Sequence, residues 1–456
     1  MTRLWETQVL KPDVIRALIA ETVAAEMEGY TPPTPGPVAA ATDLSRITVS
    51  QRRYHLTGLT VGEVSANQTW NTIRTLEGRF SWVRIGIAYD RRDDCTIAGV
   101  LLAPTASAAD PLNPVDANGD PVDFIRGTFN NGGLPIPLAD QLARQLFNVE
   151  TPAYTIAAAK APVNASQGGA PPWYKVENKT WTDWMLVPSL VRTDGGTFPL
   201  LIDRIKFTGT PSIGYGITAG FDAVAGGRFC RTYANAGDCI TTPEAFTSTE
   251  RVSELPTHVV EYMSDQGIIQ VAHNGDSIQG PLLNHVTQAV LALSTAARPL
   301  EMYHGAKGGQ SVVEYTDTMR QILPQIARGI HFLSPWSPNG TSSVALAEEA
   351  WARTMEAVDI IKKAGGVPVL MTPAPCPGRI DTVEEEAFRL LTVNRVLELG
   401  NRGYRILDQN EFYSSGGNPA GYKPGYTDDL VHPTQLAQSE LSAARTCPLL
   451  QSILDA

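Results

Sequence analysis

Three residues in the second half of the chain have the types and spacing of a nucleophilic hydrolase site. Ser277 ends a Gly-Asp-Ser triplet, and Asp429 stands three positions before His432. A serine hydroxyl attacks a carbonyl well when a histidine accepts its proton, and a third group must fix the tautomer of that histidine. One turn can supply both the carboxylate and the imidazole, whereas the serine must come from elsewhere in the fold. The sequence therefore predicts Ser277, His432 and Asp429 as a catalytic triad.

Other interpretations of these residues stay open at this point. A Gly-Asp-Ser triplet is a weak signal, because Asp276 or Ser277 could simply cap the start of a helix. Asp428 is an alternative to Asp429, although the three-residue spacing favours Asp429. Among the other six histidines, only His304 has a carboxylate three positions before it, and that pair lies along a predicted strand. We expect these six histidines to be structural.

The residues around Ser277 predict a strand, a sharp turn and a helix. The run 268–272 is mostly apolar and partly β-branched, and turn-forming residues follow it as far as Ser277. Apolar residues at helical spacing over 282–297 then predict a helix after Pro281. Ser277 should therefore lie at the carboxyl end of a strand, where open α/β sheets bind ligands.

The same alternation of strand and helix continues to the end of the chain. Alternation at this period is typical of a parallel sheet with helices on both faces. The further strands predicted are 299–303, 330–333, 367–371 and 404–407, and the further helices are 314–328, 343–364 and 382–402.

The order of these motifs resembles that of the SGNH (GDSL-type) hydrolases, over residues 256–456. In this resemblance Ser277 matches the family nucleophile, and Asp429 with His432 matches its last block. The resemblance implies a flavodoxin-like, three-layer α/β domain with a parallel sheet. The chain has no Gly-x-Ser-x-Gly motif, which argues against the α/β-hydrolase arrangement.

The resemblance also implies which groups would hold a negatively charged carbonyl oxygen. They are the N–H of the nucleophile itself, the N–H of Gly308, for which Gly309 is a shifted alternative, and the side chain of Asn339. The block around the asparagine departs from the family's Gly-x-Asn-Asp pattern. Ser337 stands in place of the glycine and Gly340 in place of the aspartate, so this assignment rests on the asparagine alone.

The preceding residues, 45–255, have a different pattern of apolar and turn-forming residues. Short alternating or β-branched runs recur between segments rich in Gly, Pro, Asn and Asp, with a helical pattern at 138–146 only. Many short strands with turn signals predict a β-sandwich or jelly roll. A sandwich ahead of an SGNH domain resembles some two-domain carbohydrate esterases, where the sandwich helps to shape the substrate cleft.

The first 44 residues are predicted to form a third part. Apolar residues at helical spacing indicate a short helix over 12–28, and a proline-rich linker follows at 31–37. This helix could pack on the same chain, or on copies of itself as an oligomerisation or anchoring element. The second alternative would suit a protein carried on a larger particle, such as a phage virion.

The composition limits which partners and cofactors are expected. The net charge of −11 over 456 residues disfavours nucleic acid, and no apolar run reaches the length of a membrane span. The first residues lack the apolar core of a signal peptide, and secreted, periplasmic and virion-associated locations stay open. The five cysteines form no zinc pattern, so we predict no metal and no cofactor; Cys230 and Cys239 could pair, although free thiols are favoured.

Together these features predict a serine esterase that acts on short acyl esters, with acetylated carbohydrate as the expected substrate. Two alternatives stay open. The same site could belong to a lipase, a thioesterase or a polyester hydrolase. The chain could instead be a structural particle protein whose SGNH-like domain binds glycan without catalysis.

Overall fold

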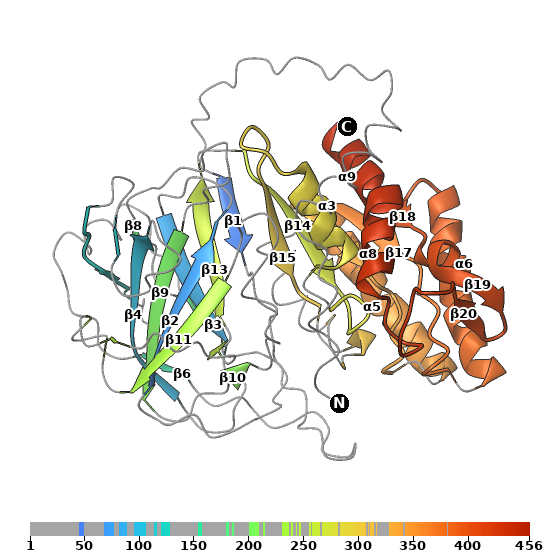
Figure 1. The fold of residues 1–456 in the computed structure, drawn as a ribbon, viewed down its shortest axis with the longest axis horizontal. Coiled ribbons are helices and arrows are strands. Elements are labelled where there is room, and N and C mark those ends of the chain that lie inside the picture. The colour runs from blue at the N-terminus through green and yellow to red at the C-terminus, as the bar shows by residue number, and fades with distance from the viewer. Residues whose placement is uncertain are drawn as a thin grey trace. The chain divides into compact units, whose positions relative to one another are not determined.

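Figure 1 shows the computed structural model of the chain, which divides into two compact units. One contains residues 269–295 and 305–456, and the other contains residues 41–268 and 296–304. The structure describes residues 45–49, 68–76, 82–88, 95–105, 114–115, 120–127, 154–156, 179–181, 185–186, 200–208, 213–214, 230–236, 239, 243, 246–247, 255–256, 258–264, 267–280, 283–306, 309, 311–313, 316, 328–340, 343–380 and 382–456. The predicted segments 1–44 and 138–146, and most of the predicted helix 314–328, lie outside these residues.

The unit that holds Ser277 is built on a parallel sheet. Its strands are β14 (Ile269–Asn274), β16 (Ile330–Leu333), β17 (Val367–Met371) and β18 (Arg405–Leu407), and each pairs in parallel with the next. Nearly every residue of the first three strands is buried. Such continuous burial is typical of parallel strands that are covered on both faces. The predicted α/β class is confirmed.

The strand order explains why the end of β14 is the place for a site. The sheet runs β15 (Leu300–His304), β14, β16, β17, β18. After β14 the chain therefore adds one strand on one side, and it then adds the remaining strands on the other side. Ligands bind at such a switch point in open α/β sheets, because the connections leave in opposite directions and open a crevice between them.

Side-chain caps set the starts of the helices. Asn284 accepts hydrogen bonds from the first N–H groups of α3 (His285–Leu293), so this helix begins three residues later than predicted. Ser343 caps α5 (Val344–Lys363), and Thr382 with Glu385 forms a capping box on α6 (Val383–Asn401). The remaining helical segments are α7 (Gln409–Tyr413), α8 (Gln435–Leu441), the π-helical turn η4 (Ser442–Thr446) and α9 (Cys447–Leu454).

The helices pack in two groups around this sheet. In one group α3, α8, η4 and α9 contact one another, and in the other α5 contacts α6 (Figure 1). A short hairpin of β19 (Ser414–Gly417) and β20 (Ala420–Tyr422) follows α7 and precedes the loop that carries His432. Among the described residues, no helix combines the length and apolar character that a membrane span needs.

The other unit is built on antiparallel sheets. One sheet has the order β1 (Ser45–Val49), β13 (His258–Ser264), β3 (Trp82–Ala88) and β7 (Lys179–Trp181), with β8 (Met185–Leu186) also on β3. A second has the order β11 (Cys230–Ala236), β2 (Gln68–Thr75), β9 (Leu200–Thr208), β4 (Cys95–Thr105) and β5 (Ile125–Arg126), with β6 (Tyr154–Ile156) also on β4. A short pair is formed by β10 (Ile213–Gly214) and β12 (Leu255–Pro256). Antiparallel pairing agrees with the predicted β-rich character, and the sandwich arrangement stays a prediction.

Candidate active site

The turn after β14 presents Ser277. A side chain at Gly275 would come within 2.7 Å of the Gln279 side chain, so the tight turn favours glycine there. The Asp276 carboxylate accepts a hydrogen bond from the N–H of Ile278 at 2.8 Å, which closes the turn around the serine. Ser277 itself is half-buried, while its neighbours on both sides are buried. The hydroxyl therefore lies at the boundary between the core and solvent.

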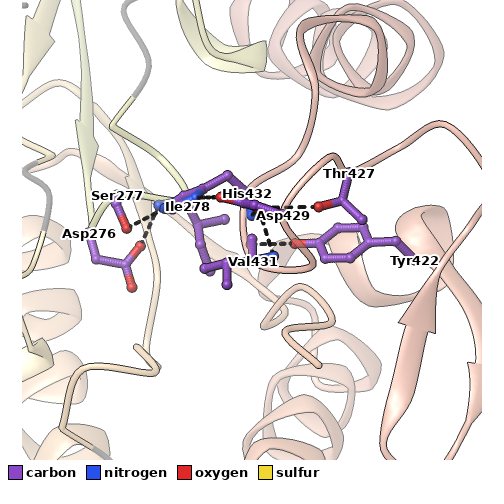
Figure 2. A network of polar contacts seen from close by, with 8 residues as sticks. All are labelled: Asp276, Ser277, Ile278, Tyr422, Thr427, Asp429, Val431 and His432. Carbon is purple, nitrogen blue, oxygen red and sulfur yellow. Dashed lines mark hydrogen bonds and ion pairs between the residues drawn. The ribbon is translucent and has the colours of Figure 1, made fainter. Parts of the chain in front are cut away.

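The loop after β20 presents the imidazole and its carboxylate (Figure 2). Asp429 Oδ1 accepts hydrogen bonds from the N–H groups of Val431 (2.9 Å) and His432 (2.7 Å), and from the Thr427 hydroxyl at 3.4 Å. Its other oxygen, Oδ2, lies 2.5 Å from His432 Nδ1. The opposite ring nitrogen, Nε2, lies 2.9 Å from Ser277 Oγ. The three residues predicted from the sequence therefore come together, hydroxyl to imidazole to carboxylate.

Two neighbouring segments donate hydrogen bonds to the backbone of this loop. The N–H of Gly378 donates to the Leu430 carbonyl at 3.0 Å, and the Tyr422 hydroxyl donates to the Val431 carbonyl at 2.9 Å. A Cβ at position 378 would come within 2.9 Å of Val431 and 3.0 Å of the Asp429 carbonyl, so only glycine allows this approach. Leu430 has a φ of 63°, a left-handed conformation that is uncommon outside glycine. The bend that aligns carboxylate and imidazole is thus a constrained one.

Two glutamines join the helix after the histidine to the segment after the serine. Gln438, on α8, donates to the Ile278 carbonyl at 3.3 Å and accepts from the His285 N–H at 3.0 Å. Gln435 donates to the Leu283 carbonyl at 3.0 Å. These contacts fix the distance between the two halves of the site. The sequence prediction did not include either glutamine. Their spacing of three residues, which puts them on one face of α8, could have indicated them.

The two carboxylates near Ser277 have opposite electrostatic settings. Partial burial acts to raise the pKa of Asp429, but hydrogen bonds from the N–H and the imidazole of His432 outweigh it and lower the pKa to about 2. Complete burial raises the pKa of Asp276 to about 6, although the Ser337 hydroxyl, the Ile278 N–H and the nearby His432 favour its charged form. Asp429 is therefore charged throughout the neutral range, whereas Asp276 changes charge near pH 6.

The residues expected to bind the oxyanion are only partly described. Gly308 lies outside the described residues, and its alternative Gly309 has a φ of 79° in a turn. Asn339 lies in the turn after β16, the strand next to β14. A Cβ at Gly340 would come 2.7 Å from the Cβ of Ser311, so the asparagine turn packs against the glycine-rich segment. The roles of Gly308 and Asn339 stay predictions.

Two features of the described residues bear on metal and thiol chemistry. Among these residues, no group of three His, Cys, Asp or Glu side chains is arranged to hold a metal ion. Burial raises the pKa of the Cys376 thiol to about 12 and that of the Cys447 thiol to about 11, which disfavours the reactive thiolate. Cys239 is buried and keeps its thiol, which agrees with the favoured interpretation that it does not pair with Cys230.

Comparisons with known proteins give matches among solved structures alone. A scan against family models and a search of curated proteins find no match. An acetyl xylan esterase is 16% identical and covers 41% of this chain and 99% of its own, with a TM-score of 0.32. A GDSL-like lipase from Bacteroides thetaiotaomicron is 13% identical and covers 40% and 88%, with a TM-score of 0.34. A protein from Bacillus subtilis is 12% identical and covers 93% and 96%, with a TM-score of 0.32. GDSL-type proteins are thus among the structures to which this chain is similar.

Proposed function

We propose that this chain is a serine hydrolase of carboxylic esters that uses Ser277 as nucleophile, His432 as base and Asp429 to orient the imidazole. The observation that carries the proposal is the unbroken set of contacts between the three side chains, 2.9 Å and 2.5 Å long. A nucleophile and its base need to lie within hydrogen-bond reach, and the base needs a third group on its other nitrogen. Both conditions are met by the same imidazole ring.

The reaction would proceed through an acyl-enzyme. His432 Nε2 accepts the proton of Ser277 Oγ while the oxygen attacks the ester carbonyl carbon. The bond to the alcohol oxygen then breaks, and His432 gives the proton to the departing alcohol. Water attacks the acyl carbonyl and gives a proton to His432, the bond between Ser277 Oγ and the acyl carbon breaks, and His432 returns the proton to Ser277 Oγ as the acid leaves. Asp429 stays charged throughout, since its pKa is about 2, and it stabilises the imidazolium that forms in each half-reaction.

The negative charge on the carbonyl oxygen would be held by fixed donors. The candidates are the Ser277 N–H, the Gly308 N–H and the Asn339 side chain. Support for this grouping comes from the sheet, where β14 and β16 are neighbours, and from the close approach of Gly340 to Ser311. Removing one such donor typically lowers the rate by about 10²–10³.

The proposed substrate is a short acyl ester, with acetyl groups on carbohydrate as the specific expectation. This choice follows from the motif order and from the β-rich residues that precede the α/β sheet, an order that resembles two-domain carbohydrate esterases. A series of p-nitrophenyl esters of increasing chain length tests the acyl preference, and rates that rise with chain length would favour a lipase instead.

The central test is hydrolysis of p-nitrophenyl acetate by the wild-type chain, Ser277→Ala and Ser452→Ala. Ser452 is an exposed serine on α9 whose hydroxyl donates to the Leu449 carbonyl, so it controls for loss of a hydroxyl elsewhere. We expect Ser277→Ala to lose activity and Ser452→Ala to keep it. An organophosphonate should label Ser277 in the wild type at one equivalent per chain. Equal hydrolysis by wild type and Ser277→Ala would refute the proposal.

A further inference from the structure

We propose that Ser337 is a positioning residue, which holds Asn339 through a hydrogen-bonded bridge that starts at the turn of the nucleophile. The inference rests on the proposed function, since it concerns how an oxyanion donor of the same site is kept in place. It assigns a role to a residue at which this chain departs from the pattern of the family that it resembles.

The two turns that the bridge connects begin side by side. Strands β14 and β16 pair in parallel, and the last pair in their register is Asn274 with Leu333. The chain leaves the first strand into the turn of Ser277 and leaves the second into the turn of Asn339. Ser337 lies in the second turn and is completely buried. A buried hydroxyl needs partners for both its proton and its oxygen, and both neighbouring turns can supply them.

The contacts of Ser337 run in both directions. Its Oγ accepts a hydrogen bond from the N–H of Asn339 at 3.2 Å. Its own proton is then available to the Asp276 carboxylate, whose charged form the Ser337 hydroxyl favours. Asp276 is fixed in turn by the N–H of Ile278 at 2.8 Å. The bridge therefore links the residues on both sides of Ser277 to the backbone of Asn339.

The sequence around this turn explains why a side-chain bridge is needed. A glycine at position 337, as in the family pattern, has no hydroxyl and could not connect the two turns. The family aspartate is also missing, since position 340 is a glycine. A side chain there would place its Cβ 2.7 Å from the Cβ of Ser311, which leaves no room for an aspartate. The turn thus lacks the polar side chain that the family has after its asparagine. Ser337 supplies a polar link from the other side of Asn339.

The first test measures steady-state hydrolysis of p-nitrophenyl acetate by Ser337→Ala. A misplaced donor loses part of the 10²–10³ in rate that such a donor contributes, so we expect kcat to fall about tenfold and KM to change less than about twofold. Ser334→Ala is the matched control, because Ser334 is a buried serine of the same turn whose hydroxyl donates to the Trp336 carbonyl at 2.9 Å. An equal loss of kcat in the control would overturn the specific role of Ser337.

A double-mutant cycle tests whether Ser337 acts through Asn339. If it does, Ser337→Ala should have no further effect on kcat in an Asn339→Ala background, so the double variant should match Asn339→Ala within about twofold. A hydroxyl that only stabilises the fold would lower kcat by the same factor in both backgrounds. Multiplicative effects of the two substitutions would therefore contradict the proposal.

Amide hydrogen exchange separates this inference from the proposed function. The Asn339 N–H should exchange faster in Ser337→Ala than in the wild type, because its acceptor is gone, whereas Ser334→Ala should leave it unchanged. This readout does not depend on activity. Unchanged exchange would refute the bridge even if the esterase proposal holds, and failure of the phosphonate to label Ser277 would refute the esterase even if the bridge is present.

Discussion

Two carboxylate–base pairs with the same spacing lie in very different surroundings in the α/β unit. Glu386 and Arg389 are three residues apart on α6, and their side chains are 1% and 0% exposed. Asp429 and His432 are also three residues apart, but they lie in a loop with side chains that are 47% and 36% exposed. The comparison separates two uses of such a pair, one that fixes the fold and one that directs a ring nitrogen at Ser277.

The buried pair is held by several hydrogen bonds. Arg389 gives two hydrogen bonds to Glu386, at 2.8 and 2.7 Å, and further bonds to the Pro373 carbonyl at 3.0 Å and to Asn410 at 2.7 Å. Glu386 also accepts from the Ala420 N–H at 3.1 Å. An ion pair out of water is tolerated when further hydrogen bonds satisfy its charged groups, and it then holds its partners in place.

The partners of the buried pair are the segments that hold the exposed pair. Pro373 begins the loop that contains Gly378, and Ala420 begins β20, which contains Tyr422. Gly378 and Tyr422 in turn bind the backbone of the loop between the carboxylate and the imidazole. The buried pair therefore fixes the segments that bind this loop, and the exposed pair keeps one ring nitrogen directed at Ser277.

The largest expected effect comes from breaking the exposed pair. His432→Ala removes the base, and we expect kcat for p-nitrophenyl acetate to fall about 10⁴-fold or more, as when a triad member is removed in other serine hydrolases. The free energy of unfolding should change by less than about 1 kcal/mol, because the ring is partly exposed. Rate measurements and urea unfolding of the same preparation check both halves. A rate within tenfold of the wild type would show that another base serves the reaction.

Breaking the buried pair should lower the free energy of unfolding strongly and change the activity little. Arg389→Met leaves the Glu386 carboxylate buried without its cation, and we expect about 3–5 kcal/mol of destabilisation. The activity of the molecules that remain folded should change only a few-fold. The matched control is Arg353→Met, which removes an ion pair to Glu349 at 2.8 Å on the surface of α5 and should cost less than about 1 kcal/mol. Equal costs for the two arginines in urea unfolding would contradict the comparison.

A third carboxylate, Asp276, sharpens the comparison because it is buried without a cation of its own. Burial raises its pKa from 3.8 to about 6, so the folded state holds this proton more tightly than the unfolded state does. The resulting stabilisation is complete below pH 4 and is lost as the pH rises through 6, and it amounts to on the order of 3 kcal/mol. Asp276→Asn removes this titration. Relative to the wild type, the variant should therefore gain stability between pH 4 and pH 7.

The measurement for Asp276 is the free energy of unfolding of both proteins at several pH values from 4 to 8. Subtracting the unfolding free energy of one protein from that of the other at each pH cancels the contributions of the other titratable groups, which are the same in both proteins. Parallel curves for wild type and Asp276→Asn over this range would mean that the carboxyl titrates alike in the folded and unfolded states.

The sequence allowed the exposed pair to be predicted but not the buried one. Ser277, Asp429 and His432 could be grouped from local turn signals and a short spacing, and the parallel strands could be predicted from apolar runs. Glu386 and Arg389 have an ordinary helical spacing. The sequence of α6 does not indicate that the helix face carrying these two residues is buried. Gly378 and Gln438 were missed for the same reason, since their partners lie tens to more than a hundred residues away. The start of α3 was misplaced because the capping role of Asn284 was overlooked.

The smallest expected effect concerns the bend inside the exposed pair. Leu430 has a φ of 63°, and a left-handed conformation costs a residue with a Cβ about 1–2 kcal/mol. Its side chain is 54% exposed, so little burial is lost when it is removed. Leu430→Gly should therefore raise stability by about 1 kcal/mol, whereas Leu430→Ala keeps the Cβ and should not. Thermal unfolding of the two variants checks the prediction, and a rise in Tm for alanine equal to that for glycine would show that the exposed apolar side chain, not the bend, is the source of the strain.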